Sequence, residues 1–261
     1  MELKDHVFLN KELKDTLVVD IHIHVGGSTR YQKPRNDADS AVYTMDRLGV
    51  DVACASCSPG AYCDFAWGNE MCGQAHAKHP ERILAYAVVN PNYDTDLDDY
   101  FVRDDRFFGI KAIPFVQGNL RIDSPGMQRF YEYADKKGLP VLFHAWQASE
   151  VADAVAVARR YPNARIVLGH SGFTTRDAKE EAIKGCKACE NVILDTTISD
   201  TYDGALEWIA DQVGADRLAY GTDLTAFECS HILGRLLMSR LSDTDKEKIL
   251  GLNAKEFLKL K

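Results

Sequence analysis

The chain has 261 residues, 46% of them hydrophobic and 27% charged, and a formal net charge of −8. This length and composition suit one large globular domain. The acidic balance argues against a nucleic acid or an anionic membrane surface as the main partner, because both bind basic patches. No stretch approaches the roughly 20 apolar residues of a membrane span, and the N-terminal residues lack a signal-peptide core. We therefore expect a cytoplasmic protein.

The cysteines agree with a reducing compartment, because seven of them at irregular spacing make a poor disulfide framework. Two pairs, Cys54/Cys57 and Cys186/Cys189, have the Cys-x-x-Cys spacing of zinc and iron–sulfur sites. The first pair lies in an apolar run and the second in an expected helix. We predict dispersed free thiols rather than a second metal site.

Strand-like and helix-like segments alternate along the chain after a lead-in over residues 1–16. Strands are predicted at residues 17–25, 50–56, 83–89, 107–113, 140–144, 164–169, 192–196 and 217–221. Helices are predicted at 37–48, 69–79, 95–103, 126–137, 149–161, 176–189, 204–213 and from about residue 230 onward. Gly49 is a predicted C-cap, Ser149 is a predicted N-cap, and residues 58–68 are expected to form a loop.

Eight strand–helix units in about 250 residues predict an α/β fold, a (β/α)8 TIM barrel formed as a single domain over residues 1–261. An open doubly wound sheet is the alternative. The sequence argues against that alternative, because no Gly-x-Gly-x-x-Gly turn follows the first strand.

Polar side chains interrupt the apolar first strand. Side chains alternate along a strand, so Asp20, His22 and His24 are expected to share one face, with Ile21 and Ile23 on the other. Two imidazoles at i and i+2 stand roughly 7 Å apart, close enough to tilt onto one metal ion. A lone His-x-His is weak evidence, because hydrogen-bonded core histidines give the same pattern.

The other strand ends strengthen the metal hypothesis. Lys111, His144, His170 and Asp223 each fall at or near the end of a predicted strand, and barrel enzymes build their sites at that rim. The remaining histidines are expected at the surface; they are His6, His76, His79 and His231. Imidazole and carboxylate ligands suit Zn²⁺, and also Mn²⁺ or Fe²⁺. Three histidines and one aspartate would supply the cage and leave one histidine for substrate.

The motifs resemble the amidohydrolase superfamily, and most closely its amidohydrolase-related branch of metal-dependent hydrolases and decarboxylases. The matching pieces are Asp20-Ile21-His22-Ile23-His24, Gly109-Ile110-Lys111, Phe143-His144, Leu168-Gly169-His170-Ser171-Gly172, Gly221-Thr222-Asp223 and Asn253-Ala254-Lys255-Glu256-Phe257. The resemblance implies that His22, His24, His144 and Asp223 are metal ligands. It makes His170 a catalytic residue that faces substrate, and it allows Asp223 to double as a base.

Lys111 is the third residue for which the resemblance implies a catalytic role. In binuclear relatives a lysine at this strand end is carbamylated and bridges two metals, with His144 and His170 on the second. In the amidohydrolase-related branch one metal is usual, and the lysine then pairs with Asp223, anchors substrate or forms a salt bridge in the rim. We predict one divalent ion, with zinc preferred, and no second ion on Lys111. Asp20 is expected to orient a ligand histidine.

Two reactions fit this ligand set. The first is hydrolysis of an amide, ester or lactone of a small molecule by metal-bound hydroxide, and we predict this one. The second is decarboxylation of the aminocarboxymuconate-semialdehyde decarboxylase type. A metal-storage barrel without enzymatic activity is a third reading.

The predicted substrate is a small molecule, with a carboxylate as one candidate group. Arg30, Arg121 and Trp146 are the predicted substrate contacts. Lys33 and Arg35 share the loop of Arg30. All of these basic residues, Arg30 and Arg121 included, are equally compatible with solvated surface charges. The candidate apolar walls are Tyr62, Phe65, Trp67, Phe115, Trp146 and Phe173. The sequence leaves homo-oligomerisation open.

Overall fold

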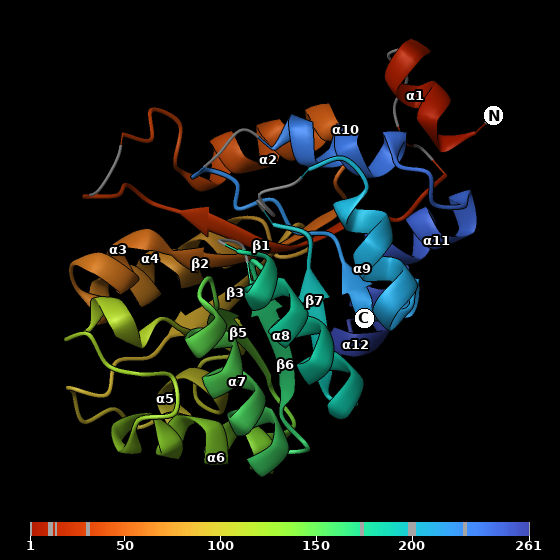
Figure 1. Cartoon of the computed structure of the whole chain (residues 1–261). Helices are drawn as coiled ribbons and strands as arrows, with labels where there is room; N and C mark the ends of the chain where they lie inside the picture. Colours follow the sequence, from red (N-terminus) through yellow and green to blue (C-terminus); the bar gives the residue numbers. More distant parts are fainter. Residues whose placement is uncertain are drawn as a thin grey trace.

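Eight parallel strands form one sheet in the order β1 to β8, and helices connect them (Figure 1). The computed structural model describes residues 2–9, 13, 15–29, 32–172, 175–197, 202–226 and 229–260. The strands are β1 (Val19–Val25), β2 (Val52–Cys57), β3 (Ile83–Val88), β4 (Phe107–Ala112), β5 (Pro140–His144), β6 (Arg165–Gly169), β7 (Val192–Asp195) and β8 (Leu218–Ala219).

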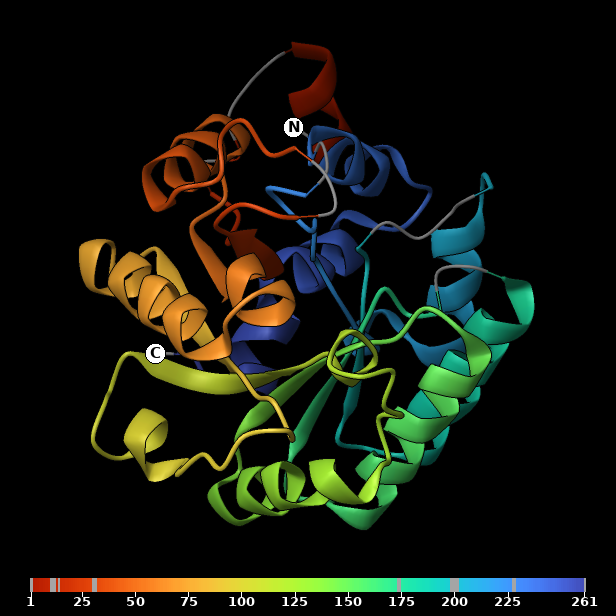
Figure 2. The ribbon, with the colours of Figure 1, turned by 90° about the vertical axis from the view of Figure 1, so that its left-hand side faces the viewer.

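The helices surround the strands as an outer ring (Figure 2). The α-helices are α1 (Leu3–Leu9), α2 (Ala38–Leu48), α3 (Ser58–Tyr62), α4 (Phe65–Lys78), α5 (Asp98–Phe101), α6 (Gln128–Lys137), α7 (Ala148–Arg160), α8 (Arg176–Ala188), α9 (Ala205–Val213), α10 (Ser230–Met238), α11 (Asp243–Glu247) and α12 (Asn253–Leu258). Short 3-10 turns are η1 (Pro114–Val116), η2 (Pro125–Met127) and η3 (Ala215–Arg217), and η4 (Lys248–Leu252) is a π-helical turn.

Backbone hydrogen bonds close the sheet between its first and last strands. The Ile21 amide donates to the Tyr220 carbonyl at 2.9 Å, and the Asp223 amide donates to the His22 carbonyl at 2.8 Å. An isolated parallel bridge joins Ile23 to Leu224. The predicted single-domain (β/α)8 barrel is therefore confirmed, and the alternative of an open sheet is wrong.

Two apolar clusters hold the barrel together. The larger one lies between the strands and the surrounding helices. The smaller one fills the barrel interior, and its buried members are Val19, Ile21, Cys54, Tyr86, Leu142, Val167, Ile193, Ala219, Ala254 and Leu258. The last two come from α12, so this helix closes the end of the barrel opposite the strand carboxyl ends. Side chains nearer those carboxyl ends are the ones free to form a site.

A register shift in β1 changes the predicted alternation. Ile21 belongs to the interior cluster, whereas Ile23 belongs to the outer one, so the expectation that they share a face is wrong. The cause is an irregularity between Asp20 and Ile23 in the pairing with β2. A β-bulge of this kind re-aims the side chains that follow it, here His22 and His24.

The helix boundaries were partly predicted. Gly49 ends α2 at φ 72°, as expected of a glycine C-cap. Residues 58–68 are not a simple loop, because α3 begins at Ser58 and the Asp64 side chain caps α4 by accepting from the Trp67 amide at 2.9 Å. Ser149 does not cap α7, which starts at Ala148. Its first turn is held by Glu150 instead, which accepts from the amide of Gln147 at 2.9 Å.

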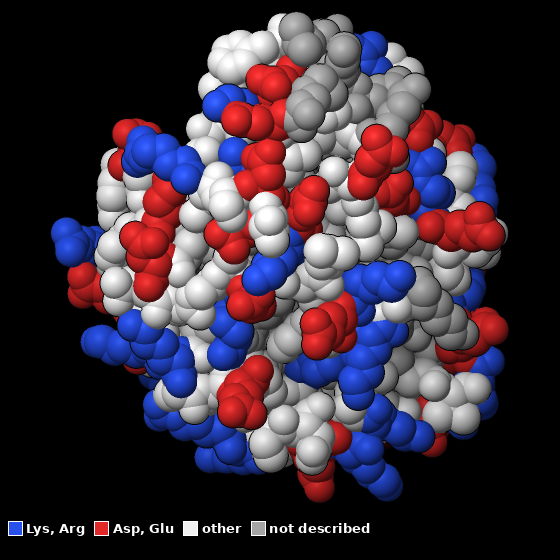
Figure 3. All heavy atoms as spheres, turned by 90° about the vertical axis from the view of Figure 1, so that its right-hand side faces the viewer, with Lys and Arg blue, Asp and Glu red and all other residues white. Residues whose placement is uncertain are grey.

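The surface of the molecule carries both acidic and basic side chains. Figure 3 shows acidic and basic side chains on the same face of the molecule. Among the described residues, no helix combines the length and the apolar character needed to cross a bilayer. The seven cysteines are not joined in disulfides, and six of them are buried.

Candidate metal centre and active site

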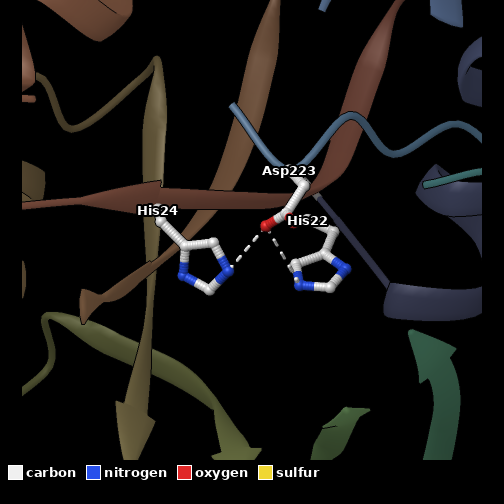
Figure 4. A group of neighbouring side chains, drawn as sticks. All are labelled: His22, His24 and Asp223. Atoms are coloured by element: carbon white, nitrogen blue, oxygen red, sulfur yellow. Dashed lines mark ion pairs between the residues drawn. The ribbon is translucent and has the colours of Figure 1, made fainter. Parts of the chain in front are cut away.

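Three ligand-type side chains meet at the carboxyl end of the barrel. The ligand atoms of His22, His24 and Asp223 all lie within 4.8 Å of one another. Asp223 Oδ1 lies 2.8 Å from His24 Nε2 and 4.0 Å from His22 Nε2. Figure 4 shows its carboxylate between the two rings, which both project from β1. Two imidazoles and a carboxylate in this arrangement can hold a divalent ion.

The other ring nitrogen of each histidine is held by a neighbouring polar group. His22 Nδ1 lies 2.7 Å from Asp195 Oδ2, and His24 Nδ1 lies 2.9 Å from Ser56 Oγ. Such contacts fix the ring orientation and leave Nε2 for a metal. Burial lowers the pKa of both histidines, with the charge of Lys111 a further cause for His22. The rings are thus held in the neutral form that metals bind.

Asp195 is the functional residue that the sequence analysis missed. It ends β7 and is buried, and its carboxylate also accepts from the His170 amide at 2.6 Å and from Thr197 Oγ1 at 2.7 Å. Burial raises its pKa to about 8. The signal that could have found it is the one used for Asp223, a carboxylate at the end of an apolar strand.

Asp20 has a different role from the one predicted. It accepts from the backbone amides of His22 and Thr222, both at 3.1 Å, and from the Thr222 hydroxyl. It therefore ties β1 to the segment after β8 through the backbone. The ring of His22 is oriented by Asp195 instead.

Two glycines leave room for His22 inside the barrel. A Cβ at Gly169 would lie 3.1 Å from His22 Cε1 and 2.3 Å from the Phe143 carbonyl oxygen. A Cβ at Gly221 would lie 3.2 Å from His22 Cβ and 2.6 Å from Thr197 Oγ1. A side chain at either position would collide with the groups that position the ligand.

The backbone is strained where two site residues leave their strands. His170 has φ 67° and Asp223 has φ 60°, in the left-handed region that side chains with a Cβ rarely adopt. Hydrogen bonds hold both: the His170 amide donates to Asp195 and the Asp223 amide to His22. Strain of this kind concentrates at functional sites.

Lys111 lies inside this cluster. Its Nζ is 2.9 Å from His22 Nε2, and the side chain is buried. Burial lowers its pKa to about 8, opposed by the charges of Asp223 and Asp195. The predicted position at the strand end is correct. Its role in catalysis, and the exclusion of a bridged second ion, stay predictions.

His144 and His170 form the opposite side of the cluster. His170 Nε2 lies 3.0 Å from His144 Nδ1, and the His22 and His170 ring centroids are 4.9 Å apart. Burial lowers the pKa of His170, with His144 the next cause. His144 is outside the group of three that meets the ligand geometry. That His144 is a fourth metal ligand therefore stays a prediction.

A cavity lies over these residues, with about 600 Å³ of empty space that includes open solvent at its mouth. It is lined by His24, Ser56, Ser58, Ala61, Tyr62, Lys111, Ile113, Phe115, His144, Trp146 and Asp223. The ring centroids of Phe115 and Trp146 lie 5.0 and 4.6 Å from that of His144. The cavity thus combines aromatic walls with a few convergent polar groups, as small-molecule sites do.

The other predicted substrate contacts lie elsewhere. Arg121 is absent from the lining; it bonds to Asp123 at 3.0 Å and to Asp153, and its side chain is 67% exposed. Arg30 falls outside the described residues, as does Phe173. Of the other candidate aromatic walls, Tyr62 and Phe115 join Trp146 in the cavity, whereas Phe65 and Trp67 belong to α4 and do not.

The donor set fits a metal ion. Among the described residues, His170 Nδ1 and Asp223 Oδ1 are buried and make no hydrogen bond, although Asp223 Oδ1 lies close to His24 Nε2 as an ion pair. An unsatisfied buried carboxylate oxygen is costly, and a cation between it and the two Nε2 atoms would remove the cost. His22, His24 and Asp223 are thus the residues that would hold the ion.

Comparison with known proteins assigns the family. The Amidohydro_2 family model, described as Amidohydrolase, matches residues 19–260. The chain therefore belongs to this amidohydrolase family, which confirms the resemblance seen in the motifs. Among curated proteins, no significant match is found.

Solved structures share the fold at low identity. The 2,6-dihydroxybenzoate decarboxylase from Rhizobium is 18% identical with a TM-score of 0.73, over 94% of this chain and 98% of that one. The 5-carboxyvanillate decarboxylase from Novosphingobium aromaticivorans DSM 12444, complexed with manganese and 4-hydroxy-3-methoxy-5-nitrobenzoic acid, is 15% identical with a TM-score of 0.75, over 95% and 97%.

A third similar structure comes from Staphylococcus aureus and carries the provisional name amidohydrolase. It is 16% identical with a TM-score of 0.72, over 93% of this chain and 99% of that one. At these identities the likeness establishes the barrel and does not decide between hydrolysis and decarboxylation.

Proposed function

We propose that this protein is a metal-dependent decarboxylase of a small aromatic or unsaturated carboxylic acid. The observation that carries the proposal is the cavity, in which aromatic walls and a buried lysine adjoin the metal-ligand group. Flat apolar walls suit an unsaturated ring, and the ammonium group of Lys111 suits a carboxylate. The similar decarboxylases of aromatic acids support the same choice.

His22, His24 and Asp223 would hold one divalent ion. When bound, it supplies a Lewis acid that draws in anionic oxygen and offsets charge developing on the substrate. Zinc agrees with the His and Asp donors. Manganese is the ion in two similar decarboxylase structures and is an equal candidate.

The chain's own residues then have separate tasks. The bond between the substrate carbon and its carboxylate breaks, CO₂ leaves, and the electron pair stays on the carbon, which takes up one proton. His144 lines the cavity and lies 3.0 Å from His170, so the two rings would relay that proton from solvent to the carbon. Phe115 and Trp146 keep water from the reacting carbon, and Lys111 offsets negative charge beside His22.

Hydrolysis by the same residues stays the second candidate. It is favoured by the position of Asp223, whose Oδ1 lies between the two imidazoles where a base for an activated water would act. A decarboxylase needs no such base, so the two functions make different demands on the site.

A substrate panel separates the two. The metal-loaded protein would be incubated with 2,6-dihydroxybenzoate, 5-carboxyvanillate and related acids, and in parallel with aryl esters, lactones and amides. We expect CO₂ release, without net addition of water, that disappears in His22→Ala. Formation of a new carboxylic acid from an ester, lactone or amide, with no CO₂ from any acid, would contradict the proposal and support hydrolysis.

A further inference from the structure

One lysine of the loop after β1 is buried while its neighbours are exposed. Lys33 is 6% exposed, whereas Gln32, Pro34 and Arg35 are exposed. The loop is fixed around it, because the Asn36 side chain donates to the Lys33 carbonyl and the Asn36 carbonyl accepts from the Gly26 amide at 2.6 Å. A buried ammonium group is costly unless it serves a partner.

One partner of Lys33 is a serine in the cavity wall. Lys33 Nζ donates to Ser58 Oγ at 2.7 Å, and Ser58 lines the cavity. The hydroxyl hydrogen of Ser58 has no acceptor among the residues that the structure describes. Because the Lys33 ammonium group donates to the Ser58 oxygen, the Ser58 O–H is left to donate into the cavity. A hydroxyl group that accepts a hydrogen bond from an ammonium group is a stronger donor. It therefore binds an ionised oxygen in preference to a neutral one.

This serine lies apart from the metal ligands. Ser56, two residues earlier in β2, already contacts His24. Ser58 begins α3, directly after β2, and lines the same cavity. The cavity thus has two places for an anion, one at the ligand group and one at Ser58. Among the described residues of its lining, Asp223 is the only carboxylate, against the ammonium of Lys111 and the charge of Lys33 behind Ser58.

We propose that Ser58, backed by Lys33, binds a second ionised oxygen of the substrate, a carboxylate or a phenolate separate from the group that reacts. In the proposed function the reacting carboxylate lies at the ligand group beside Lys111, which leaves Ser58 for the other anionic oxygen. The inference rests on the proposed function for the identity of the reacting group. It narrows the substrate class to acids with two anionic oxygen groups.

Binding measurements test this without turnover. Calorimetric titration of the metal-loaded protein would compare benzoate with two dianions: isophthalate, which adds a carboxylate, and 3-hydroxy-4-nitrobenzoate, which adds a phenolate near neutral pH. We expect at least one dianion to bind about 10-fold or more tightly than benzoate, in line with a charge-assisted hydrogen bond. The dianion that shows the preference identifies the group.

Two variants and a control complete the experiment. Lys33→Met and Ser58→Ala should each bring the ratio of dianion to benzoate affinity close to one while benzoate binding stays the same. Lys136→Met, an exposed lysine of α6, should leave the ratio unchanged. If Lys33→Met fails to fold, Ser58→Ala still removes the proposed donor alone. An unchanged ratio in Ser58→Ala would overturn the inference. Absence of CO₂ release with an intact ratio would count against the decarboxylase proposal only.

Discussion

The two walls of the cavity are built in different ways. The metal wall, taken together with the residues behind it, consists of His22, His24, Asp195 and Asp223, on or after strands β1, β7 and β8. Of these, His24 and Asp223 line the cavity itself. The substrate wall consists of Ser58, Tyr62, Phe115 and Trp146, which lie in α3, in η1 and in the loop after β5. The first is held by hydrogen bonds between neighbouring strand ends, and the second by loops that vary independently of the barrel. The metal wall therefore determines where in the barrel the reaction takes place. The substrate wall determines which molecule is bound there and reacts.

The largest expected effect comes from removing a ligand in the metal wall. We expect His22→Ala to lower metal affinity by more than about 100-fold, because loss of a supporting contact alone costs about 10- to 100-fold. Activity should fall to background. Metal content by mass spectrometry and a competition titration would measure this. His79→Ala, which removes a histidine that pairs with Asp39 on the surface, is the control and should retain the metal.

His170 distinguishes metal binding from proton transfer. We expect His170→Gln to lower kcat by about 10²- to 10⁴-fold, the usual contribution of a positioned acid or base, and to leave the metal content intact. Single-turnover kinetics together with metal analysis would check it. Loss of the metal in this variant to the same degree as in His22→Ala would make His170 a ligand and would revive the binuclear arrangement.

The same division explains how much could be predicted from the sequence. The eight strands and the rim positions of His22, His24, His144, His170 and Asp223 could be predicted, because strand periodicity and barrel topology determine which end of each strand a residue reaches. The bulge in β1 could not, since it depends on pairing with β2. Neither could the burial of Lys33, which depends on how its loop folds back onto α3.

Asp195 links the ligand His22 to the backbone of His170, so its variant is expected to have an intermediate effect. Asp195→Asn would present an amide N–H₂ or a weaker acceptor to His22 Nδ1 in place of the carboxylate. We expect metal affinity to fall by about 10- to 100-fold. Thr197→Val removes only the hydroxyl that donates to the same carboxylate and should cost much less. Equal metal affinity in Asp195→Asn and the unaltered protein would mean that the carboxylate does not orient the ligand.

The smallest effect is expected at Arg121, which the sequence analysis placed on the substrate. In the structure its guanidinium group pairs with Asp123 and Asp153 outside the cavity lining. Both pairs lie away from the lining residues, so the loss of the guanidinium group should not affect a bound substrate. We expect Arg121→Gln to change KM by less than about twofold and to leave kcat and metal content unaltered, as steady-state kinetics would show. A rise in KM of about 10-fold at constant kcat would instead place Arg121 on the bound substrate. The substrate wall would then extend along the segment after β4, from Phe115 as far as Arg121.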